Sequence, residues 1–342
     1  MRILGLTQRE SGCGWHRVLM PLAFMQGVKG HVTNIPTVET LAKGFDMILY
    51  NRFSIWDSNI AEIKPQYKVV VDMDDDWVLP FGHIMAIGYE KFQQRIESNL
   101  ANADLVTCTN QRLHDRIKPF NTNVIVLPNA IPYGEHQYTD FKEDSLAVRI
   151  FWAGSVTHER DLAMLRGPLQ KLKAYGPKIK MVLGGYTDTD PNSKAIWQRM
   201  FSSFTAGGRL PWMRMSGTTP NEYMRHYEHA DIMVIPLEQS DWHACKSNLK
   251  ILEAAAKKIP VICSKVEPYS LDSDAPVFWV EKQSDWYKHL KTLINEPQTR
   301  QSYGEALHEW AKSKYNFATI NEQRKQAFAR LVGDVETPQT LP

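Results

Sequence analysis

The stretch "KSNLKILEAAAKKIPVI", residues 246–262, decides the fold. Leu249, Leu252 and Ala256 recur at helical spacing, which predicts a helix over 247–257 with Ser247 as its N-cap. A short apolar strand is predicted at 261–263. A helix that leads directly into a buried strand is typical of a parallel α/β unit.

The polar residues of this helix gather at its first turn. Lys250 and Glu253 lie on one face, together with Lys246. The backbone N–H groups around Asn248 and Leu249 start the helix, and such a start carries about half a positive charge. A phosphate gains about 0.3–2 kcal/mol there, and Lys250 can reach it. This predicts a phosphate-binding turn; the alternative is a solvent-facing Lys250–Glu253 ion pair.

The same alternation of strands and helices continues along the chain. Strands are expected at 2–6, 47–50, 68–71, 105–107, 124–127, 149–153, 180–184, 232–236, 261–263 and 277–280. Helices are expected at 17–26, 84–101, 111–117, 161–174, 221–228, 247–257 and 285–295. The pattern predicts an α/β protein whose parallel sheets are covered on both faces.

The chain length of 342 residues favours two lobes. The polar, turn-rich stretch 133–147 is the expected connector. We therefore expect an N-terminal domain over 1–140, a C-terminal domain over 141–330 and a flexible tail over 331–342. Each domain is predicted to be a doubly wound, Rossmann-like lobe, with a cleft between the two.

Composition and charge exclude several classes of protein. With 43% hydrophobic and 23% charged residues, the chain is typical of a globular enzyme. No run of apolar residues is long enough for a membrane helix, and no signal peptide is expected. The four cysteines, Cys13, Cys108, Cys245 and Cys263, form no CxxC pair. This argues against a classical zinc site and favours the cytoplasm.

The charge is unevenly distributed along the chain. Residues 1–145 hold 14 Lys and Arg against 17 Asp and Glu, whereas the rest holds 26 against 21. A basic second half favours a phosphate-bearing ligand there, and an acidic first half argues against a long nucleic-acid track.

Four segments, taken together, resemble a known family. They are "ADLVTCTNQRLHDRI…NVIVLPNAI" (103–131), "RIFWAGSVTHERDLAML" (149–165), "ADIMVIPL" (230–237) and the opening stretch. In this order they resemble GT-B glycosyltransferases of the retaining, GT4-like group. The resemblance implies a GT-B fold and transfer of a sugar, with retention, from a nucleoside-diphosphate sugar, with a UDP-sugar favoured. It also implies no metal and no other cofactor, and that Glu253 accepts hydrogen bonds from the ribose hydroxyls.

The chain departs from this family at one position. The family's second glutamate, eight residues before Glu253, is replaced by Cys245. This leaves the donor sugar open, with Asp241 and His243 as substitutes for the missing carboxylate.

The loop "AGSVTHERD" (153–161) follows a predicted strand, where open α/β sheets bind ligands. At the place where the family has Gly-Arg, this chain has Gly154-Ser155. Where the family has a lysine five residues later, this chain has Arg160. Arg160 can clamp a diphosphate, and Ser155 can complete an anion-binding nest. Thr157, His158 and Asp161 form a THxxD variant found in a subset of the family. The alternative is that Thr157 and Asp161 cap the next helix.

A glycine-containing loop follows the first strand. Gly12 and Gly14 allow a ligand close to the backbone, but Arg17 stands where an NAD fingerprint needs glycine. The resemblance implies contacts with donor and acceptor here, with Arg17 reaching a phosphate. The alternative is a tight turn with a surface arginine.

Four carboxylates, Asp72, Asp74, Asp75 and Asp76, end another strand and must repel one another. They could cap a helix, bind the acceptor or take its proton, or hold a divalent ion. We select Asp74 and Asp75 as catalytic candidates, with Arg160 and Lys250 on the donor side. Trp77 and Phe81 could stack on a sugar, but we favour core packing for both.

The acceptor stays open: a glycan, a lipid-linked sugar or DNA, as in viral enzymes that glycosylate hydroxymethylated pyrimidines. Two functions besides sugar transfer also stay open, namely a sugar-nucleotide epimerase and a non-catalytic binding module. The oligomeric state is not predicted.

Overall fold

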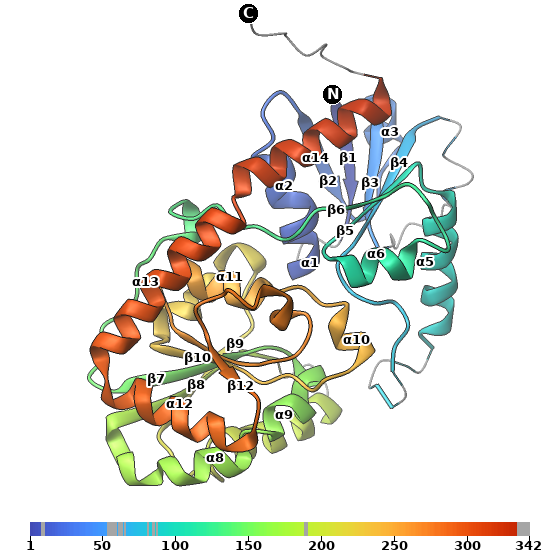
Figure 1. Cartoon of the computed structure of the whole chain (residues 1–342). Coiled ribbons are helices and arrows are strands. Elements are labelled where there is room, and N and C mark those ends of the chain that lie inside the picture. The colour runs from blue at the N-terminus through green and yellow to red at the C-terminus, as the bar shows by residue number, and fades with distance from the viewer. Residues whose placement is uncertain are drawn as a thin grey trace, which may run out of the picture. The chain divides into compact units, whose positions relative to one another are not determined.

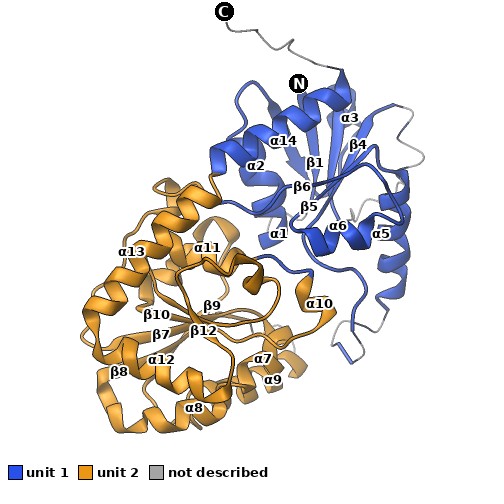
Figure 2. Cartoon of the chain, in the orientation of Figure 1, with its two compact units in different colours: residues 1–130, 245–247, 317–342 blue, residues 131–244, 248–316 orange. Residues whose placement is uncertain are grey.

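The computed structural model describes residues 1–7, 11–52, 60, 64, 66–80, 82–83, 86, 88–187 and 191–333. The chain forms two compact units, shown in Figure 2. Unit 1 comprises residues 1–130, 245–247 and 317–342, and unit 2 comprises residues 131–244 and 248–316. Each unit is built on one six-stranded sheet (Figure 1).

The sheet of unit 1 is parallel and has the strand order β2-β1-β3-β4-β5-β6. Its strands are β1 (Arg2–Leu6), β2 (Lys29–Thr33), β3 (Met47–Asn51), β4 (Lys68–Met73), β5 (Leu105–Cys108) and β6 (Val124–Val126). Its helices include α1 (Gly12–Gly14), a π-helical turn (Trp15–Leu19), α2 (Met20–Ala23), α3 (Val38–Ala42), α5 (Glu90–Asn102), α6 (Gln111–Ile117) and α14 (Phe317–Val332). The central strands are apolar runs because both faces of the sheet are covered.

The sheet of unit 2 is also parallel, with the order β12-β11-β10-β7-β8-β9. Its strands are β7 (Val148–Ala153), β8 (Ile179–Tyr186), β9 (Trp212–Ser216), β10 (Ile232–Ile235), β11 (Val261–Ser264) and β12 (Phe278–Val280). Its helices include α7 (Glu159–Ala163), α8 (Arg166–Gln170), α9 (Pro191–Phe204), α10 (Asp241–Ala244), α11 (Leu249–Ala256), α12 (Gln283–Asn295) and α13 (Pro297–Lys314). Short 3₁₀ segments lie at Val156–His158, Lys171–Lys178, Pro220–Arg225, Tyr227–His229 and Tyr269–Asp272. This strand order is that of a doubly wound, Rossmann-like sheet.

All ten predicted strands are present, which confirms the α/β class and the two Rossmann-like lobes. The edge strands β2 and β9 were not predicted. The helix expected at 161–174 is broken into α7, α8 and a 3₁₀ segment, and the one expected at 221–228 is 3₁₀ rather than α-helical. The helix expected at 84–101 begins at Glu90.

The units differ from the expected domains in three ways. Unit 1 ends at Ala130 rather than at residue 140, and it also takes up residues 245–247 and α14. Helix α14 crosses the strands of unit 1 in Figure 1, where Phe328 packs in one buried cluster with Ile3 and Leu49. The expected tail begins too early, since Leu331 and Val332 close this helix. Residues 334–342 and Phe81 lie outside the described residues.

Candidate functional site

The strand order of unit 2 reverses between β7 and β10. Ligands of doubly wound sheets bind at such a point, outside the carboxyl ends of the strands. The loop after β7, the loop after β10 and the start of α11 all belong to this edge. It contains most of the residues predicted for the donor.

The loop after β7 is shaped around the buried indole of Trp152. A Cβ atom on Gly154 would lie 2.7 Å from that ring, so only glycine fits. Gly185 has a φ of +89°, and a Cβ there would lie 2.6 Å from the carbonyl oxygen of Gly154. Beyond Gly154, the hydroxyls of Ser155 and Thr157 are 2.7 Å apart. Small polar groups therefore line this loop, as an anion-binding turn requires.

Asp161 joins the loops after β7 and β10. Its carboxylate accepts hydrogen bonds from Nδ1 of His158 at 2.7 Å and from the backbone N–H of Glu238 at 2.8 Å. Burial alone would raise the pKa of Asp161, but the bonds from His158 and Glu238 lower it. Nε2 of His243 lies 3.9 Å from the same carboxylate. The convergence of His158 and His243 on Asp161 was not predicted.

Helix α11 begins at Leu249, with Asn248 as its N-cap. The Asn248 side chain does not cap the helix; it donates to Asp272 at 2.6 Å instead. The prediction that Ser247 caps the helix is wrong, because its hydroxyl accepts a hydrogen bond from Asn129 at 2.9 Å. The helix end thus keeps its partial positive charge without a side-chain cap.

Lys250 lies in the first turn of α11, and its ammonium is 5.5 Å from the centre of the Trp152 ring. The ring of His158 is 6.4 Å from the same indole. Gly154, His158 and Lys250, predicted from separate motifs, therefore gather around one tryptophan. Trp152 was missed because it lies within an apolar strand.

Glu253 is 4% exposed and accepts a hydrogen bond from the hydroxyl of Tyr227 at 2.5 Å. A solvent-facing Lys250–Glu253 pair is therefore excluded. Burial raises the pKa of Tyr227, as does the neighbouring Glu253 carboxylate, so Tyr227 stays a donor. Glu253 is held in position, as a residue that must receive ribose hydroxyls would be.

Two further predicted donor ligands, Arg160 and Lys246, have different surroundings. Arg160 is exposed on α7 and forms no ion pair with another described residue. Lys246 precedes α11, in the segment that belongs to unit 1, and its ammonium lies 2.9 Å from Asp75. The expectation that Lys246 shares a helix face with Lys250 is wrong, because the helix begins three residues later.

In unit 1 the expected role of Arg17 is overturned. Arg17 is 1% exposed, and its guanidinium donates two bonds of 2.8 Å to Asp72. It also donates to the carbonyl oxygen of Leu127 and to Asn129. Burial alone would lower the pKa of Arg17, but Asp72 raises it. Arg17 is neither a surface residue nor a phosphate ligand; it is part of a buried ion pair.

Gly12 and Gly14 do not form an open loop. They make up the short α1, and Ser11 accepts a hydrogen bond from the N–H of Gly14 at 2.9 Å. The next residues continue as a π-helical turn that carries Arg17 into the interior. The glycines therefore start a helix at the carboxyl end of β1.

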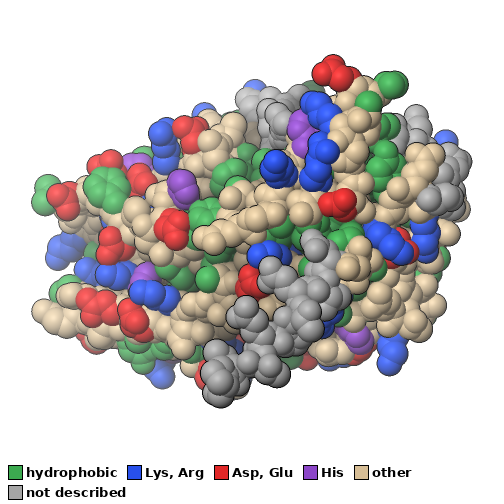
Figure 3. Space-filling view, turned by 90° about the horizontal axis from the view of Figure 1, so that it is seen from above, with side chains coloured by type: hydrophobic (Ala, Val, Ile, Leu, Met, Phe, Trp, Pro, Cys, Tyr) green, Lys and Arg blue, Asp and Glu red, His purple; other side chains and the backbone are tan. Residues whose placement is uncertain are grey.

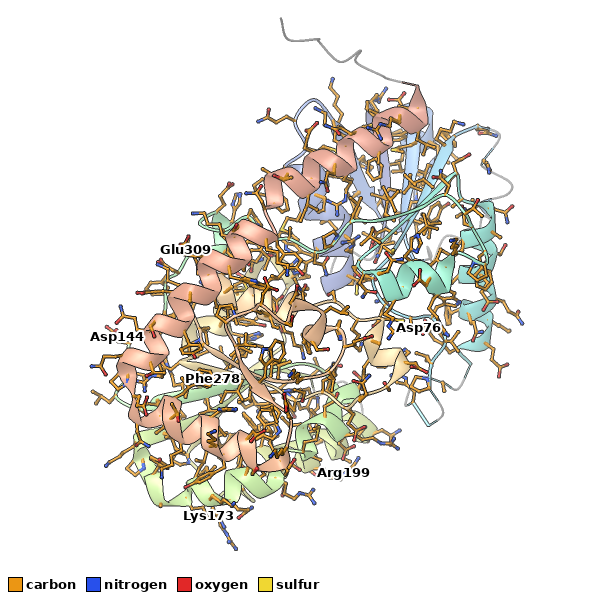
Figure 4. The ribbon with its side chains drawn as sticks, in the orientation of Figure 1. Asp76, Asp144, Lys173, Arg199, Phe278 and Glu309 are labelled. Atoms are coloured by element: carbon orange, nitrogen blue, oxygen red, sulfur yellow. The ribbon has the colours of Figure 1, made fainter. Side chains whose placement is uncertain are left out.

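The other carboxylates after β4 also meet cations. Arg52 donates to Asp74 at 2.7 Å, and the guanidinium of Arg116 lies 2.9 Å from Asp76. Figure 4 shows Asp76 beside α6, which carries Arg116. Burial alone would raise the pKa of Asp74, but Arg52 lowers it to about 2. Together with the Lys246–Asp75 pair, these contacts explain how adjacent carboxylates are tolerated in one turn.

The described part of the chain holds neither a metal cluster nor a membrane-spanning helix. No group of three His, Cys, Asp or Glu side chains within it could hold a metal ion. No helix among these residues has the length and hydropathy needed to cross a membrane. All four cysteines, each within the described ranges, are free thiols. On the face presented in Figure 3, acidic and basic side chains are interspersed.

Sequence comparisons identify no relative: no family model and no curated protein matches the chain. Solved structures do match. Sucrose-phosphate synthase from Thermosynechococcus elongatus aligns with a TM-score of 0.69 at 13% identity, over 98% of this chain and 100% of that one. HepE from Anabaena, in complex with UDP-glucose, aligns with a TM-score of 0.65 at 14% identity, over 96% of this chain and 100% of that one.

An alpha-glucosyltransferase in complex with UDP and a 13-mer DNA containing an HMU base gives a TM-score of 0.68 at 12% identity, over 97% and 99% of the two chains. These alignments extend over nearly the full length of each protein. The two Rossmann-like units of this chain therefore adopt the fold of the GT-B glycosyltransferases.

Proposed function

We propose that the protein is a glycosyltransferase that moves a sugar from a nucleoside-diphosphate sugar to an acceptor hydroxyl. The observation that carries the proposal is the convergence of Gly154, His158 and Lys250 on Trp152 at the switch point of unit 2. Neighbours with this fold include glycosyltransferases bound to UDP or UDP-glucose, which favours a UDP-sugar as donor.

The diphosphate is assigned to the start of α11. The N–H groups of its first turn and Lys250 stabilise the charge that develops on the leaving diphosphate. The ammonium of Lys250, 5.5 Å from the centre of the Trp152 ring, supplies a charge-assisted contact to this phosphate. Arg160, exposed on α7, adds a second cation. These groups neutralise charge without a metal ion or another cofactor.

Glu253 is assigned to the ribose, and Asp161 is a positioning residue. By accepting from Nδ1 of His158, Asp161 directs Nε2 of that ring to a substrate oxygen. Cys245 stands where the family has a carboxylate for the donor sugar. We assign His243 to that sugar instead. Its Nδ1 lies 2.8 Å from the carbonyl oxygen of Glu238, which holds the ring in position. We further propose that transfer retains the anomeric configuration.

On the acceptor side, Asp75 is favoured over Asp74 as the group that meets the acceptor hydroxyl. A carboxylate with a pKa of about 2 is a poor general base near neutral pH, which argues against Asp74. Asp74 instead anchors Arg52. Because Asp74, Asp75 and Asp76 already meet Arg52, Lys246 and Arg116, they are unsuited to share a divalent ion.

A transfer assay with different acceptors identifies the acceptor class. The purified protein is incubated with UDP-glucose and other nucleotide sugars, and nucleoside-diphosphate release is followed with glycans, lipid-linked sugars or DNA that contains hydroxymethylated pyrimidines. DNA is included because a neighbour of this fold and length is bound to such DNA. Product mass identifies the transferred sugar. Absence of transfer and hydrolysis with every donor, despite UDP binding, would reduce the protein to a binding module.

A further inference from the structure

Unit 2 contains a cavity of about 360 Å³ that lies away from the switch point. Asp231 and Pro260, which line it, immediately precede β10 and β11, so the cavity is at the amino ends of these strands. Lys258, another lining residue, follows the last turn of α11. The cavity and the proposed diphosphate site are therefore at opposite ends of the same helix.

The carboxylates of this cavity are engaged by neighbours. Asp231 accepts from both Nε and Nη2 of Arg149, at 2.9 and 3.0 Å. Asp140 accepts from Lys258 at 2.7 Å, and Glu305 accepts from Gln301 at 2.9 Å. Asp231 and Asp140 thus each have a cationic partner other than Lys142 and Arg300.

Four cations line the cavity, namely Lys142, Lys257, Lys258 and Arg300. Lys257 lies 3.3 Å from Glu228 and Lys258 bonds Asp140, which leaves Lys142 and Arg300. Neither forms an ion pair with another described residue, although Arg300 donates through Nη1 to the carbonyl oxygens of Leu293 and Ile294. Burial lowers the pKa of Lys142, and the nearby Arg149 and Arg300 lower it further. Asp231 and Asp140 raise it, but the net change is a lowering. Burial also lowers the pKa of Arg300. The crowded cations disfavour one another, and an anion between them would relieve this.

Helix α13 adds a positive end to the same cavity. Its first turn contributes Pro297 and Arg300 to the lining and has no acidic residue. The N-cap residue Glu296 does not cap the helix with its side chain, which accepts from the Thr299 hydroxyl at 2.9 Å instead. The connector that carries Lys142 reaches this helix, because Lys142 lines the same cavity as Pro297 and Arg300. The ammonium of Lys142 from the connector, and the guanidinium of Arg300 and the helix start from α13, thus line one volume.

We propose that this cavity binds a small phosphate-bearing molecule, whose phosphate is held by Lys142, Arg300 and the first turn of α13. A phosphate suits the geometry better than a carboxylate because its oxygens can accept hydrogen bonds from several directions at once. A volume of about 360 Å³ admits a small phosphomonoester. The site is independent of sugar transfer and does not require the proposed function to hold.

The test is a crystallographic soak of the full chain in tungstate, a heavy analogue of phosphate. We expect an anomalous peak between Lys142 and Arg300 in the wild type and none in Lys142→Met. Lys173→Met is the matched control, since Lys173 is also a half-buried lysine of unit 2 and lies away from the cavity (Figure 4). It should keep the peak. Any peak at the start of α11 is scored separately and bears only on the proposed function.

Calorimetric titration with inorganic phosphate and with glycerol phosphate, with UDP at saturation, gives the affinity in solution. Loss of the charge-assisted bonds from Lys142 should weaken binding about tenfold or more, while Lys173→Met should bind as the wild type does. No peak in the wild type, a peak that persists in Lys142→Met, or equal affinities of Lys142→Met and wild type would each overturn the proposal.

Discussion

The two units place charged residues at the same edge of similar sheets but use them differently. In unit 1 the carboxylates at the end of β4 and just after it each meet a cation, and Asp72 near the end of the strand pairs with the buried Arg17. In unit 2 the cations near β7 and α11 include Lys250 on an aromatic ring and Arg160 exposed on α7. The helix start beside them has no side-chain cap.

This difference separates structural charge from charge available to a ligand. A buried arginine that bonds a carboxylate through two nitrogens is satisfied by the fold itself. The contact of Lys250 with an aromatic ring, worth about 0.5–2 kcal/mol, is weaker than a buried ion pair of two bonds. The comparison therefore predicts that substitutions in unit 1 affect stability and those in unit 2 affect turnover.

The largest effect is expected from breaking the buried pair of unit 1. Arg17→Met leaves Asp72 buried without its guanidinium, which should lower the free energy of unfolding by about 3–5 kcal/mol. Thermal unfolding followed by circular dichroism measures this. Arg199→Met is the control, because Arg199 forms an exposed ion pair with Glu159 and should cost less than about 1 kcal/mol (Figure 4). Equal losses in both variants would contradict the structural role of Arg17.

Removal of the α11 lysine should act on catalysis instead. Lys250→Met is expected to lower kcat/KM for transfer by about 10²–10³-fold, since it removes a charge that stabilises the leaving diphosphate. Its control is Lys171→Met, because the Lys171 ammonium lies 5.3 Å from the ring of Tyr287 in a similar contact. Wild-type turnover in Lys250→Met, or an equal loss in Lys171→Met, would argue against the assignment.

A pair of variants separates the two possible roles of Glu253. Glu253→Gln weakens both a ribose contact and the bond from Tyr227, whereas Tyr227→Phe removes only the latter. We expect Glu253→Gln to raise KM for the donor about tenfold, with Tyr227→Phe near the wild-type KM. The steady-state KM of both variants for UDP-sugar measures this. Similar KM values in both would make Glu253 a purely structural residue.

The smallest expected effect is a dependence of the free energy of unfolding on pH, through Asp74 of unit 1. The pKa of Asp74 is lowered to about 2 from its usual 3.8, so its contribution to stability is present above about pH 4 and is lost as pH falls towards 2. Urea unfolding of the wild type should show this loss between pH 4 and 2, and Asp74→Asn should lack it. Parallel pH profiles of the two proteins would show that Asp74 does not interact with Arg52 as described.

The fold could be predicted from the sequence because buried parallel strands are apolar runs, as β4 and β10 are. The edge strands β2 and β9 were missed because each is partly exposed and mixes polar with apolar residues. The return of α14 to unit 1 was missed because it rests on the contacts of Phe328 with residues at the other end of the chain.

Only those parts of the site that rest on local sequence motifs could be predicted. The start of α11 and the loop after β7 are local motifs, so Lys250, Gly154 and His158 could be identified from short spacings. Arg17 was misassigned because its partner Asp72 is 55 residues away, and no local pattern indicates an ion pair at that separation.

The most direct test of the central claim is a crystal structure of the protein with UDP. The account predicts the β-phosphate at the start of α11, hydrogen-bonded to backbone N–H groups of its first turn and to Lys250, with the ribose on Glu253. A diphosphate bound elsewhere on unit 2, with the start of α11 unoccupied, would contradict it.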